Sequence, residues 1–182
     1  MKTDVMFIHG TQIMLIGTRH KRIEDNRKFN VENQKEYIVL NRFKPELIFV
    51  ELTERKNLKS KAKNFTDISA IYQYKIDNNI KTINYDSETQ KMYLEYVIYR
   101  PDSLEDKIEN VENDDEYRKI LKQEYPEMFY DIYEQRENKS ITNFFDGVGN
   151  YDRIAIHCGL KHYNTYKNFF EFLSNSNKYI KL

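Results

Sequence analysis

The sequence predicts an α/β fold in which a mainly parallel central sheet is flanked by helices. Short apolar runs alternate along the chain with longer segments of helical spacing, which is typical of strands joined by crossover helices. No stretch rich in Pro, Gly or Ser divides the chain, so we expect a single domain over 1–182. An acidic stretch without strand signals, residues 104–145, predicts a helical insertion that lies beside the sheet and precedes the last core strand.

Two apolar runs open the chain, at residues 5–8 and 12–16, and His9-Gly10-Thr11 separates them. This pattern is typical of a tight hairpin or of one interrupted strand, and we prefer the hairpin, with His9 exposed at its turn. Gly17 is expected to turn the chain sharply at the end of the second run. His20 then follows at the edge of the sheet.

Strand and helix patterns continue to alternate through the first half of the chain, which favours parallel pairing of the strands. Pro45 stops the first helix, Glu51 lies near the carboxyl end of the strand after it, and Asp86 follows the next strand. The expected elements are helices over 31–43, 66–79 and 88–100 and strands over 47–52 and 81–85.

The second half is expected to hold two or three helices within 104–145, broken by Pro126, and then the last core strand. That strand covers 153–158, and Gly159 ends it. The spacing of apolar residues predicts a closing helix over 163–173.

Polar residues accompany the carboxyl end of each expected core strand. In an open α/β sheet, functional groups gather beyond these ends, where the N-termini of helices also point. We therefore expect one shared cleft. Its candidate residues are Gly17, Arg19 and His20 after the first strand, Glu51 on the second, Asp86 after the third, and Gly159 and His162 after the last.

Two strand ends share the spacing Gly-x-x-His, one from Gly17 to His20 and the other from Gly159 to His162. Glycine lets the chain turn without placing a side chain in the cleft, and the histidine can fold back over the same opening. A neutral imidazole can act as a general base or as a metal ligand. Glu51 can orient the imidazole or complete a coordination sphere, so the motif residues suggest a divalent metal as cofactor, with His20, Glu51 and His162 as its ligands.

Charge and composition limit the partners of the protein. Basic side chains outnumber acidic ones over 1–84, acidic ones outnumber basic ones over 85–152, and the whole chain is neutral. Without an extended basic face nucleic acid is not an expected partner, and without a long apolar run neither is a membrane. A single cysteine, Cys158, fits a reducing compartment, so we expect the protein in the cytoplasm.

Four segments carry a further pattern. They are Leu15-Ile16-Gly17-Thr18-Arg19-His20, Pro45-Glu46-Leu47-Ile48-Phe49-Val50-Glu51-Leu52 with Arg55 following, Arg136-Glu137-Asn138, and Ile156-His157-Cys158-Gly159-Leu160-Lys161-His162. Together they resemble the superfamily that contains TraB and TIKI proteins, ChaN-like haem-uptake proteins and erythromycin esterases. The resemblance implies an α/β fold with both Gly-x-x-His motifs facing one cleft, and it associates His20, Glu51, Arg136 and His162 with the site.

This chain departs from the superfamily in three respects that bear on the substrate pocket. It is shorter than many members, Cys158, with His157 beside it, stands where an apolar residue usually precedes the last glycine, and the middle of the chain is unusually acidic. The superfamily itself is divided between hydrolases, proposed metal-dependent peptidases, haem-binding proteins and regulators. A resemblance of fold therefore does not fix the function.

From the resemblance and the motif chemistry we expect a hydrolase that cleaves an ester or amide bond in a small molecule or peptide, with water as nucleophile. His20 is expected to be the general base or a ligand to the metal, with Glu51 orienting it or sharing the metal. His162 is expected to be the second base or ligand, and Arg136 to stabilise developing negative charge. The expected substrate-binding residues are Gly17, Arg19, Asp86 and Gly159.

Two other interpretations stay open. A binding module on the same fold would hold haem or a peptide between the motif histidines and a tyrosine, for which Tyr85, Tyr93 and Tyr163 are candidates. A regulatory protein would use the histidines only to stabilise turns.

His157 and Cys158 lie next to each other in the last expected strand. Because adjacent strand residues point to opposite faces, they are not expected to form a Cys–His dyad, and Cys158 is interpreted as a small buried hydrophobe. His157 either joins the site as an additional ligand or is hydrogen-bonded between sheet and helix.

Overall fold

A computed structural model of the chain describes residues 1–18, 26–51, 66–85 and 114–176. These residues form a five-stranded sheet with the strand order β1-β2-β5-β3-β4. Only β1 runs antiparallel to its neighbour, so the expected mainly parallel α/β fold is confirmed. The strands are β1 (Lys2–Ile8), β2 (Thr11–Thr18), β3 (Leu47–Val50), β4 (Lys81–Asn84) and β5 (Arg153–Gly159).

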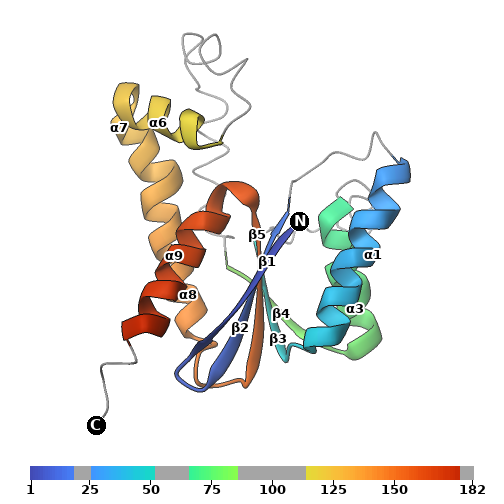
Figure 1. Ribbon diagram of the computed structural model, residues 1–182. Helices are drawn as coiled ribbons and strands as arrows, with labels where there is room; N and C mark the ends of the chain where they lie inside the picture. Colours follow the sequence, from blue (N-terminus) through green and yellow to red (C-terminus); the bar gives the residue numbers. More distant parts are fainter. Residues whose placement is uncertain (19–25, 52–65, 86–113, 177–182) are drawn as a thin grey trace.

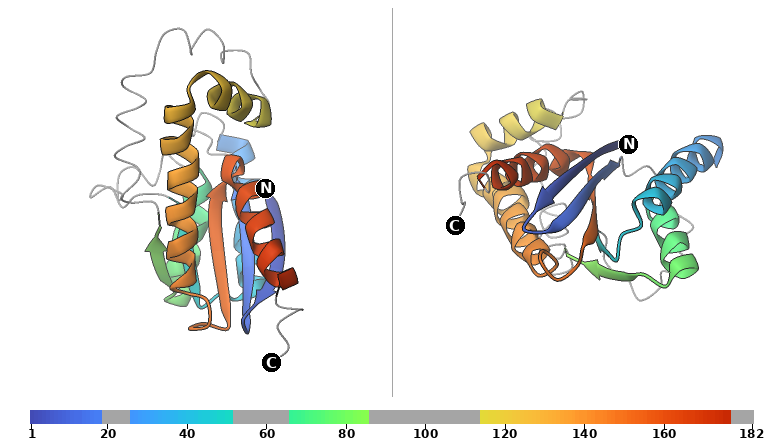
Figure 2. Two further views of the ribbon diagram at one scale, coloured as in Figure 1. Left: turned by 90° about the vertical axis from the view of Figure 1, so that its left-hand side faces the viewer. Right: turned by 60° about the horizontal axis from the view of Figure 1, so that its bottom comes forward.

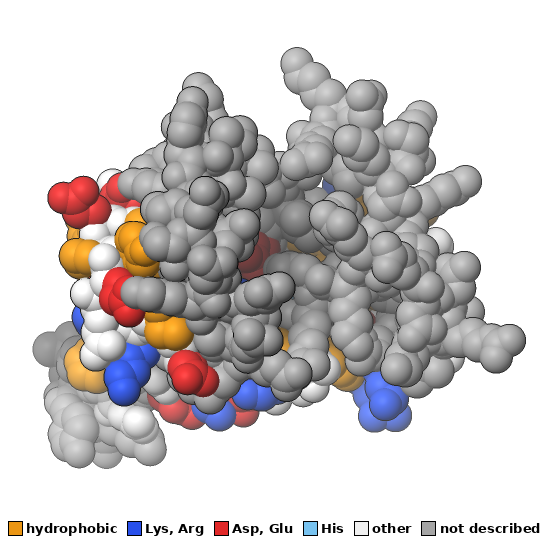
Figure 3. Space-filling view, turned by 90° about the horizontal axis from the view of Figure 1, so that it is seen from above, with side chains coloured by type: hydrophobic (Ala, Val, Ile, Leu, Met, Phe, Trp, Pro, Cys, Tyr) orange, Lys and Arg blue, Asp and Glu red, His pale blue; other side chains and the backbone are white. Residues whose placement is uncertain are grey.

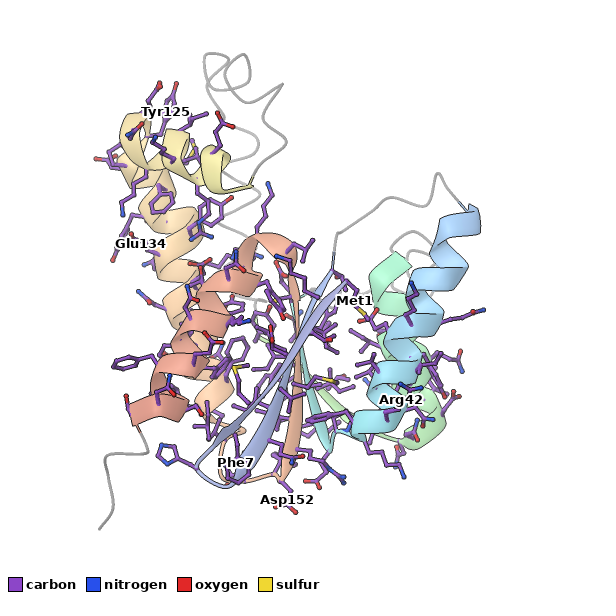
Figure 4. The ribbon with its side chains drawn as sticks, in the orientation of Figure 1. Met1, Phe7, Arg42, Tyr125, Glu134 and Asp152 are labelled. Carbon is purple, nitrogen blue, oxygen red and sulfur yellow. The ribbon has the colours of Figure 1, made fainter. Side chains whose placement is uncertain are left out.

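Helices cover both faces of this sheet (Figure 1). One layer consists of α1 (Asn26–Phe43) and α3 (Thr66–Asn78), and the other contains α8 (Arg136–Phe145) and α9 (Leu160–Ser176). The two further views in Figure 2 show the same layers. Three short elements lead into α8, namely α6 (Asp114–Glu124), α7 (Pro126–Phe129) and the π-helical turn η2 (Tyr130–Gln135). Figure 4 labels Tyr125 in this region, above the sheet.

The central strand β5 is buried on both of its faces. Ile154, Ile156 and Cys158 pack in the core cluster that includes residues of α9, whereas Ala155 packs in the cluster that includes residues of α1 and α3. A parallel strand covered by helices on both sides has a continuous apolar sequence. The apolar run at β5 therefore predicts this strand well. His157 and Cys158 point to opposite faces, as expected, and Cys158 is fully buried.

β1 and β2 form the expected hairpin, and His9 is exposed at its turn. His9 has a φ of 48° and Gly10 has a φ of 87°, while Ile8 pairs with Thr11 across the loop. Positive φ at both loop residues is the geometry of the two-residue turns that match the twist of a hairpin.

The prediction of a sharp turn at Gly17 is wrong. Gly17 lies inside β2, where it pairs with Lys2 on one side and with Cys158 on the other. A Cβ at this position would lie 2.9 Å from Cγ of the Tyr163 ring and closer still to its Cδ2. Glycine is needed here because the Tyr163 ring packs directly on the strand.

The helix expected over 163–173 starts earlier than predicted. α9 begins at Leu160, directly after Gly159, so His162 lies in the first turn of a helix rather than in a loop. The sequence does not indicate this start, because glycine at position 159 is typical of a turn. The helices predicted over 31–43 and 66–79 are present as α1, which begins earlier, at Asn26, and α3, which ends at Asn78. Both are followed by a residue with positive φ, Lys44 and Asn79 respectively.

Within 104–145, α8 belongs to the layer that covers the sheet rather than lying beside it. Phe144 is fully buried, and its ring lies 5.4 Å from the ring of Phe49, 4.7 Å from that of Tyr85 and 5.2 Å from that of Tyr166. Pro126 begins α7 and so separates two helices, as predicted. The helix predicted over 88–100 and the start of the insertion lie outside the described residues.

In the part of the chain that the structure describes, no helix is long and apolar enough to span a bilayer.

Candidate functional site

The carboxyl ends of the four parallel strands meet at one edge of the sheet, which is the upper edge in Figure 1. From β3 the chain leads to α3 on one face, whereas from β5 it leads to α9 on the opposite face. Neighbouring strands whose connections leave on opposite faces mark the place where open α/β sheets bind ligands. Glu51 and Gly159 lie at this place between β3 and β5, because Glu51 follows β3 and Gly159 ends β5. Figure 3 looks onto this end of the molecule, and an acidic side chain is visible near its centre.

Glu51 is held by both of its carboxylate oxygens. The backbone N–H of Gly159 donates a hydrogen bond to Oε2, and Nη2 of Arg136 donates to Oε1 at 3.1 Å. Only 6% of Glu51 is exposed, so its charge is buried together with that of its partner. The carboxylate thereby connects β3, β5 and α8 at the edge of the sheet.

His162 lies at the centre of the cluster. Its Nδ1 lies 2.8 Å from Oε1 of Glu137, and its Nε2 lies 3.3 Å from Nη1 of Arg136 and 3.6 Å from Oε1 of Glu51. The residue is 4% exposed. One imidazole therefore contacts side chains from both α8 and the end of β3.

Glu137 is shared between His162 and Arg118. Nη1 and Nη2 of Arg118 donate to its two oxygens at 2.9 and 3.1 Å, a bidentate arrangement that favours the ionised carboxylate. Burial alone would raise the pKa of Glu137, but the hydrogen bonds from His162 and Arg118, together with the positive charge of Arg118, outweigh it and lower the pKa. Arg118 also donates to the carbonyl oxygen of Lys161 at 3.0 Å, which connects α6 to the first turn of α9.

The contacts of His162 indicate where its proton lies. A guanidinium can only donate hydrogen bonds, so the contact from Arg136 requires a lone pair on Nε2 and places the proton of the neutral ring on Nδ1, toward Glu137. A neutral imidazole also balances the cluster, since Arg118 and Arg136 carry two positive charges and Glu51 and Glu137 carry two negative charges. An unbalanced charge would be costly in a site buried to this degree.

Aromatic rings enclose the imidazole. The ring of Tyr166 stacks on it at a centroid distance of 6.0 Å, and the ring of Tyr133 lies 5.8 Å away. The guanidinium of Arg118 lies over the Tyr133 ring at 4.4 Å, a cation–π contact. Tyr133 belongs to the π-helical turn η2, which directly precedes Arg136, and π-helical turns are frequent at functional sites.

The structure brings together three of the four residues expected to be catalytic, which are Glu51, Arg136 and His162. Of the expected substrate-binding residues, Gly159 contributes its backbone N–H to Glu51, and Gly17 packs against Tyr163. The other expected residues, His20, Arg19 and Asp86, lie outside the described part of the chain.

Two members of the cluster were missed by sequence reasoning. Glu137 stands beside Arg136 in one of the motif segments, and that adjacency was the available signal for it. No sequence pattern indicates that Arg118 belongs to the cluster, because it lies in a helix of mixed charge and is 19 residues from Glu137 in the sequence.

A metal fits the described residues poorly. Among them, no group of three or more His, Cys, Asp or Glu side chains is placed to hold a metal ion. Glu51 and His162 lie close together, but the guanidinium of Arg136 contacts both and puts a positive charge where the ion would lie. The guanidinium of Arg136 therefore lies between these two side chains in the described part of the site.

His157 does not join this cluster. It faces the α1 layer, where its Nε2 lies 2.9 Å from Oγ1 of Thr18 and 3.6 Å from Oε1 of Glu36, and it is fully buried. This contact between sheet and helix is one of the two arrangements that the sequence left open. Two of the three tyrosines considered for a binding module are engaged, because the hydroxyl of Tyr85 donates to the carbonyl oxygen of His157 and that of Tyr163 donates to Asp4. The third, Tyr93, lies outside the described residues.

Comparison with protein-family models, with curated proteins and with solved structures finds no match for the chain. The resemblance to the TraB, TIKI, ChaN and erythromycin esterase superfamily thus stays a prediction from short motifs. The geometry of the buried cluster is the basis for a functional proposal.

Proposed function

We propose that the protein is a hydrolase that cleaves an ester or amide bond, with water as nucleophile and His162 as general base. The observation that carries the proposal is the contact between Nδ1 of His162 and Oε1 of Glu137 at 2.8 Å. A carboxylate at Nδ1 fixes the tautomer, orients the ring and stabilises the imidazolium that forms when Nε2 accepts a proton. Nε2 is then the basic atom available to a reacting water.

Arg136 supplies the positive charge that such a reaction requires. It lies 3.3 Å from the basic nitrogen and 3.1 Å from Oε1 of Glu51, so it is anchored beside the position of the reacting atoms. In the proposed reaction a bound substrate draws the guanidinium toward its carbonyl oxygen, and a water takes the vacated place at Nε2. The guanidinium then stabilises the negative charge that develops on that oxygen.

The proton transfers follow from this arrangement. Nε2 of His162 takes a proton from the water as its oxygen bonds to the carbonyl carbon of the substrate. The C–O or C–N bond then breaks, and the imidazolium returns the proton to the departing oxygen or nitrogen. Glu137 keeps its charge throughout and acts as a positioning residue, while Glu51 holds Arg136 in the resting state. The role expected for His20, a base or a ligand, rests on the sequence alone.

The test is hydrolysis of a panel of p-nitrophenyl esters and p-nitroanilides by the wild type and by His162→Gln. We expect the substitution to lower kcat/KM by about 100-fold or more, the range of general-base catalysis. His157→Gln is the matched control, because His157 is equally buried but faces the opposite side of the sheet. Its kcat/KM should stay near that of the wild type.

Two results would overturn the proposal. One is a folded wild-type protein that cleaves no ester or amide in the panel. The other is a His162→Gln variant that keeps the native circular dichroism spectrum and the full activity of the wild type.

A further inference from the structure

β1 forms one outer edge of the sheet and, among the described residues, pairs only with β2. Gln12 faces Phe7 across this pair, and its backbone N–H donates to the carbonyl oxygen of Asp152 at 2.7 Å, on the side away from β1. Phe7 and Gln12 are therefore a pair without mutual hydrogen bonds, and such pairs alternate with bonded pairs along an antiparallel ladder. It follows that the backbone groups of Thr3, Val5 and Phe7 point outward from the sheet.

The side chains of these outer-edge residues are exposed as well. Val5 is 59% exposed and Phe7 is 60% exposed, and both lie on the same side of the strand as Thr3. Phe7 is labelled near the lower end of the hairpin in Figure 4. Proteins usually protect an outer strand by keeping it short, charged or interrupted, as at the four-residue strand β4. β1 has seven residues and presents two large apolar side chains at its open edge.

We propose that β1 pairs antiparallel with β1 of a second copy of this chain, around a two-fold axis at Val5. In this register Val5 faces Val5 of the second copy, and Thr3 faces Phe7. The residues that meet in hydrogen-bonded pairs are then the same three whose backbone groups point outward. The exposed valines and phenylalanines also come together on one face of the joined sheet, which removes apolar surface from water.

Charge disfavours one neighbouring register, and the geometry of the hairpin turn disfavours the other. A shift that places Thr3 opposite Val5 puts Asp4 directly opposite Asp4 of the second copy, and like charges in facing positions are destabilising. The opposite shift places Thr3 opposite His9, which lies in the hairpin turn with a positive φ. The register centred on Val5 places Asp4 opposite Met6 and so brings no like charges together.

The resulting dimer is isologous and extends the sheet through both subunits. β2 separates β1 from β5 and β3, and His162 and Glu51 are both buried, so neither belongs to the dimer surface. The proposal is therefore independent of the proposed hydrolase activity.

Analytical ultracentrifugation tests this pairing. The wild type should sediment, in a concentration-dependent manner, with a mass approaching twice the 22.2 kDa of one chain. Val5→Lys should sediment as a monomer, because it places two like charges at the two-fold axis. Ile76→Lys, which alters an equally exposed residue on α3, should remain dimeric. A wild type that is monomeric at every concentration up to its solubility limit would overturn the proposal, as would a dimer that Val5→Lys leaves intact.

Disulfide cross-linking tests the register. Oxidation should give a covalent dimer of Val5→Cys, since this position meets its own copy, and should not do so for Thr3→Cys, which faces Phe7. The native cysteine, Cys158, is fully buried and does not interfere. Efficient cross-linking of Thr3→Cys without that of Val5→Cys would contradict the register.

Discussion

Nδ1 of His162 lies 2.8 Å from Oε1 of Glu137, although 25 residues separate them in the sequence. His162 stands in the first turn of α9, which β5 delivers to the edge of the sheet, and Glu137 stands in the first turn of α8. The contact thus fixes the relative position of two helices that cover the same face. It also orients the imidazole whose other nitrogen, Nε2, is the proposed base.

The ion pair of Glu137 makes stability depend on acid pH. The carboxyl titrates at its ordinary value of 4.5 when the chain is unfolded and at a lower pKa when it is folded. Its stabilisation is therefore fully present above pH 4.5 and is lost as the pH falls through the folded pKa. We expect Glu137→Gln to lower the free energy of unfolding by about 3–5 kcal/mol at pH 7. Urea titrations should show this difference from the wild type shrinking below pH 4.5.

Glu127→Gln is the control for that experiment, since Glu127 is an exposed carboxylate on the neighbouring helix α7. It should leave the free energy of unfolding nearly unchanged across the same pH range. A Glu137→Gln difference that is constant from pH 7 to pH 3 would show that the carboxylate charge does not stabilise the fold.

The pair of Glu51 and Arg136 should behave as one unit. Each side chain is almost fully buried, so replacing either one leaves an uncompensated charge in the site. We expect Glu51→Gln and Arg136→Met each to lower the free energy of unfolding by about 3–5 kcal/mol, and the double variant to lose clearly less than the sum. Strict additivity in the double-mutant cycle would mean that the two charges do not stabilise each other.

Gly17→Ala should destabilise the protein by about 1–3 kcal/mol, because the added methyl group would overlap the Tyr163 ring. Thermal unfolding of single and double variants can separate this clash from any effect of the strand itself. In a Tyr163→Leu background the same substitution should be clearly less destabilising, since the ring is gone. An equal loss in both backgrounds would argue against the packing explanation.

Phe144 and Phe145 offer a matched pair of adjacent aromatic residues on α8. Phe144 is fully buried among Phe49, Tyr85 and Tyr166, so Phe144→Ala should lower the free energy of unfolding by about 3–5 kcal/mol. Phe145 is 41% exposed, and Phe145→Ala should have a much smaller effect in the same denaturant titration. Equal losses of unfolding free energy in the two variants would contradict the burial of Phe144 in the core.

Much of the fold could be predicted because its signals are local. The apolar runs at β2, β3 and β5 identify buried strands, and Pro45 marks the end of α1. The convergence of Glu51 and His162 was also predictable, since parallel strands bring their carboxyl ends to one edge.

The remaining features depend on contacts that sequence patterns do not show. Gly17 suggested a turn, but its role is to admit the ring of Tyr163, which is distant in the sequence. Arg118 joins the site only because α6 is placed over the start of α9. Glu137 stood next to a predicted residue, yet nothing in the sequence indicated that it faces His162.

The central claim is that Glu137 holds a neutral His162 whose Nε2 carries no proton and can accept one from water once Arg136 has moved toward the substrate. The most direct measurement is a two-dimensional NMR experiment that correlates the ring protons of His162 with both ring nitrogens at pH 7, assigned by comparison with His162→Gln. We predict a protonated Nδ1 and an unprotonated Nε2 in the wild type, with this preference weakened in Glu137→Gln. A proton on Nε2, whether in the other tautomer or in the imidazolium, would contradict the account.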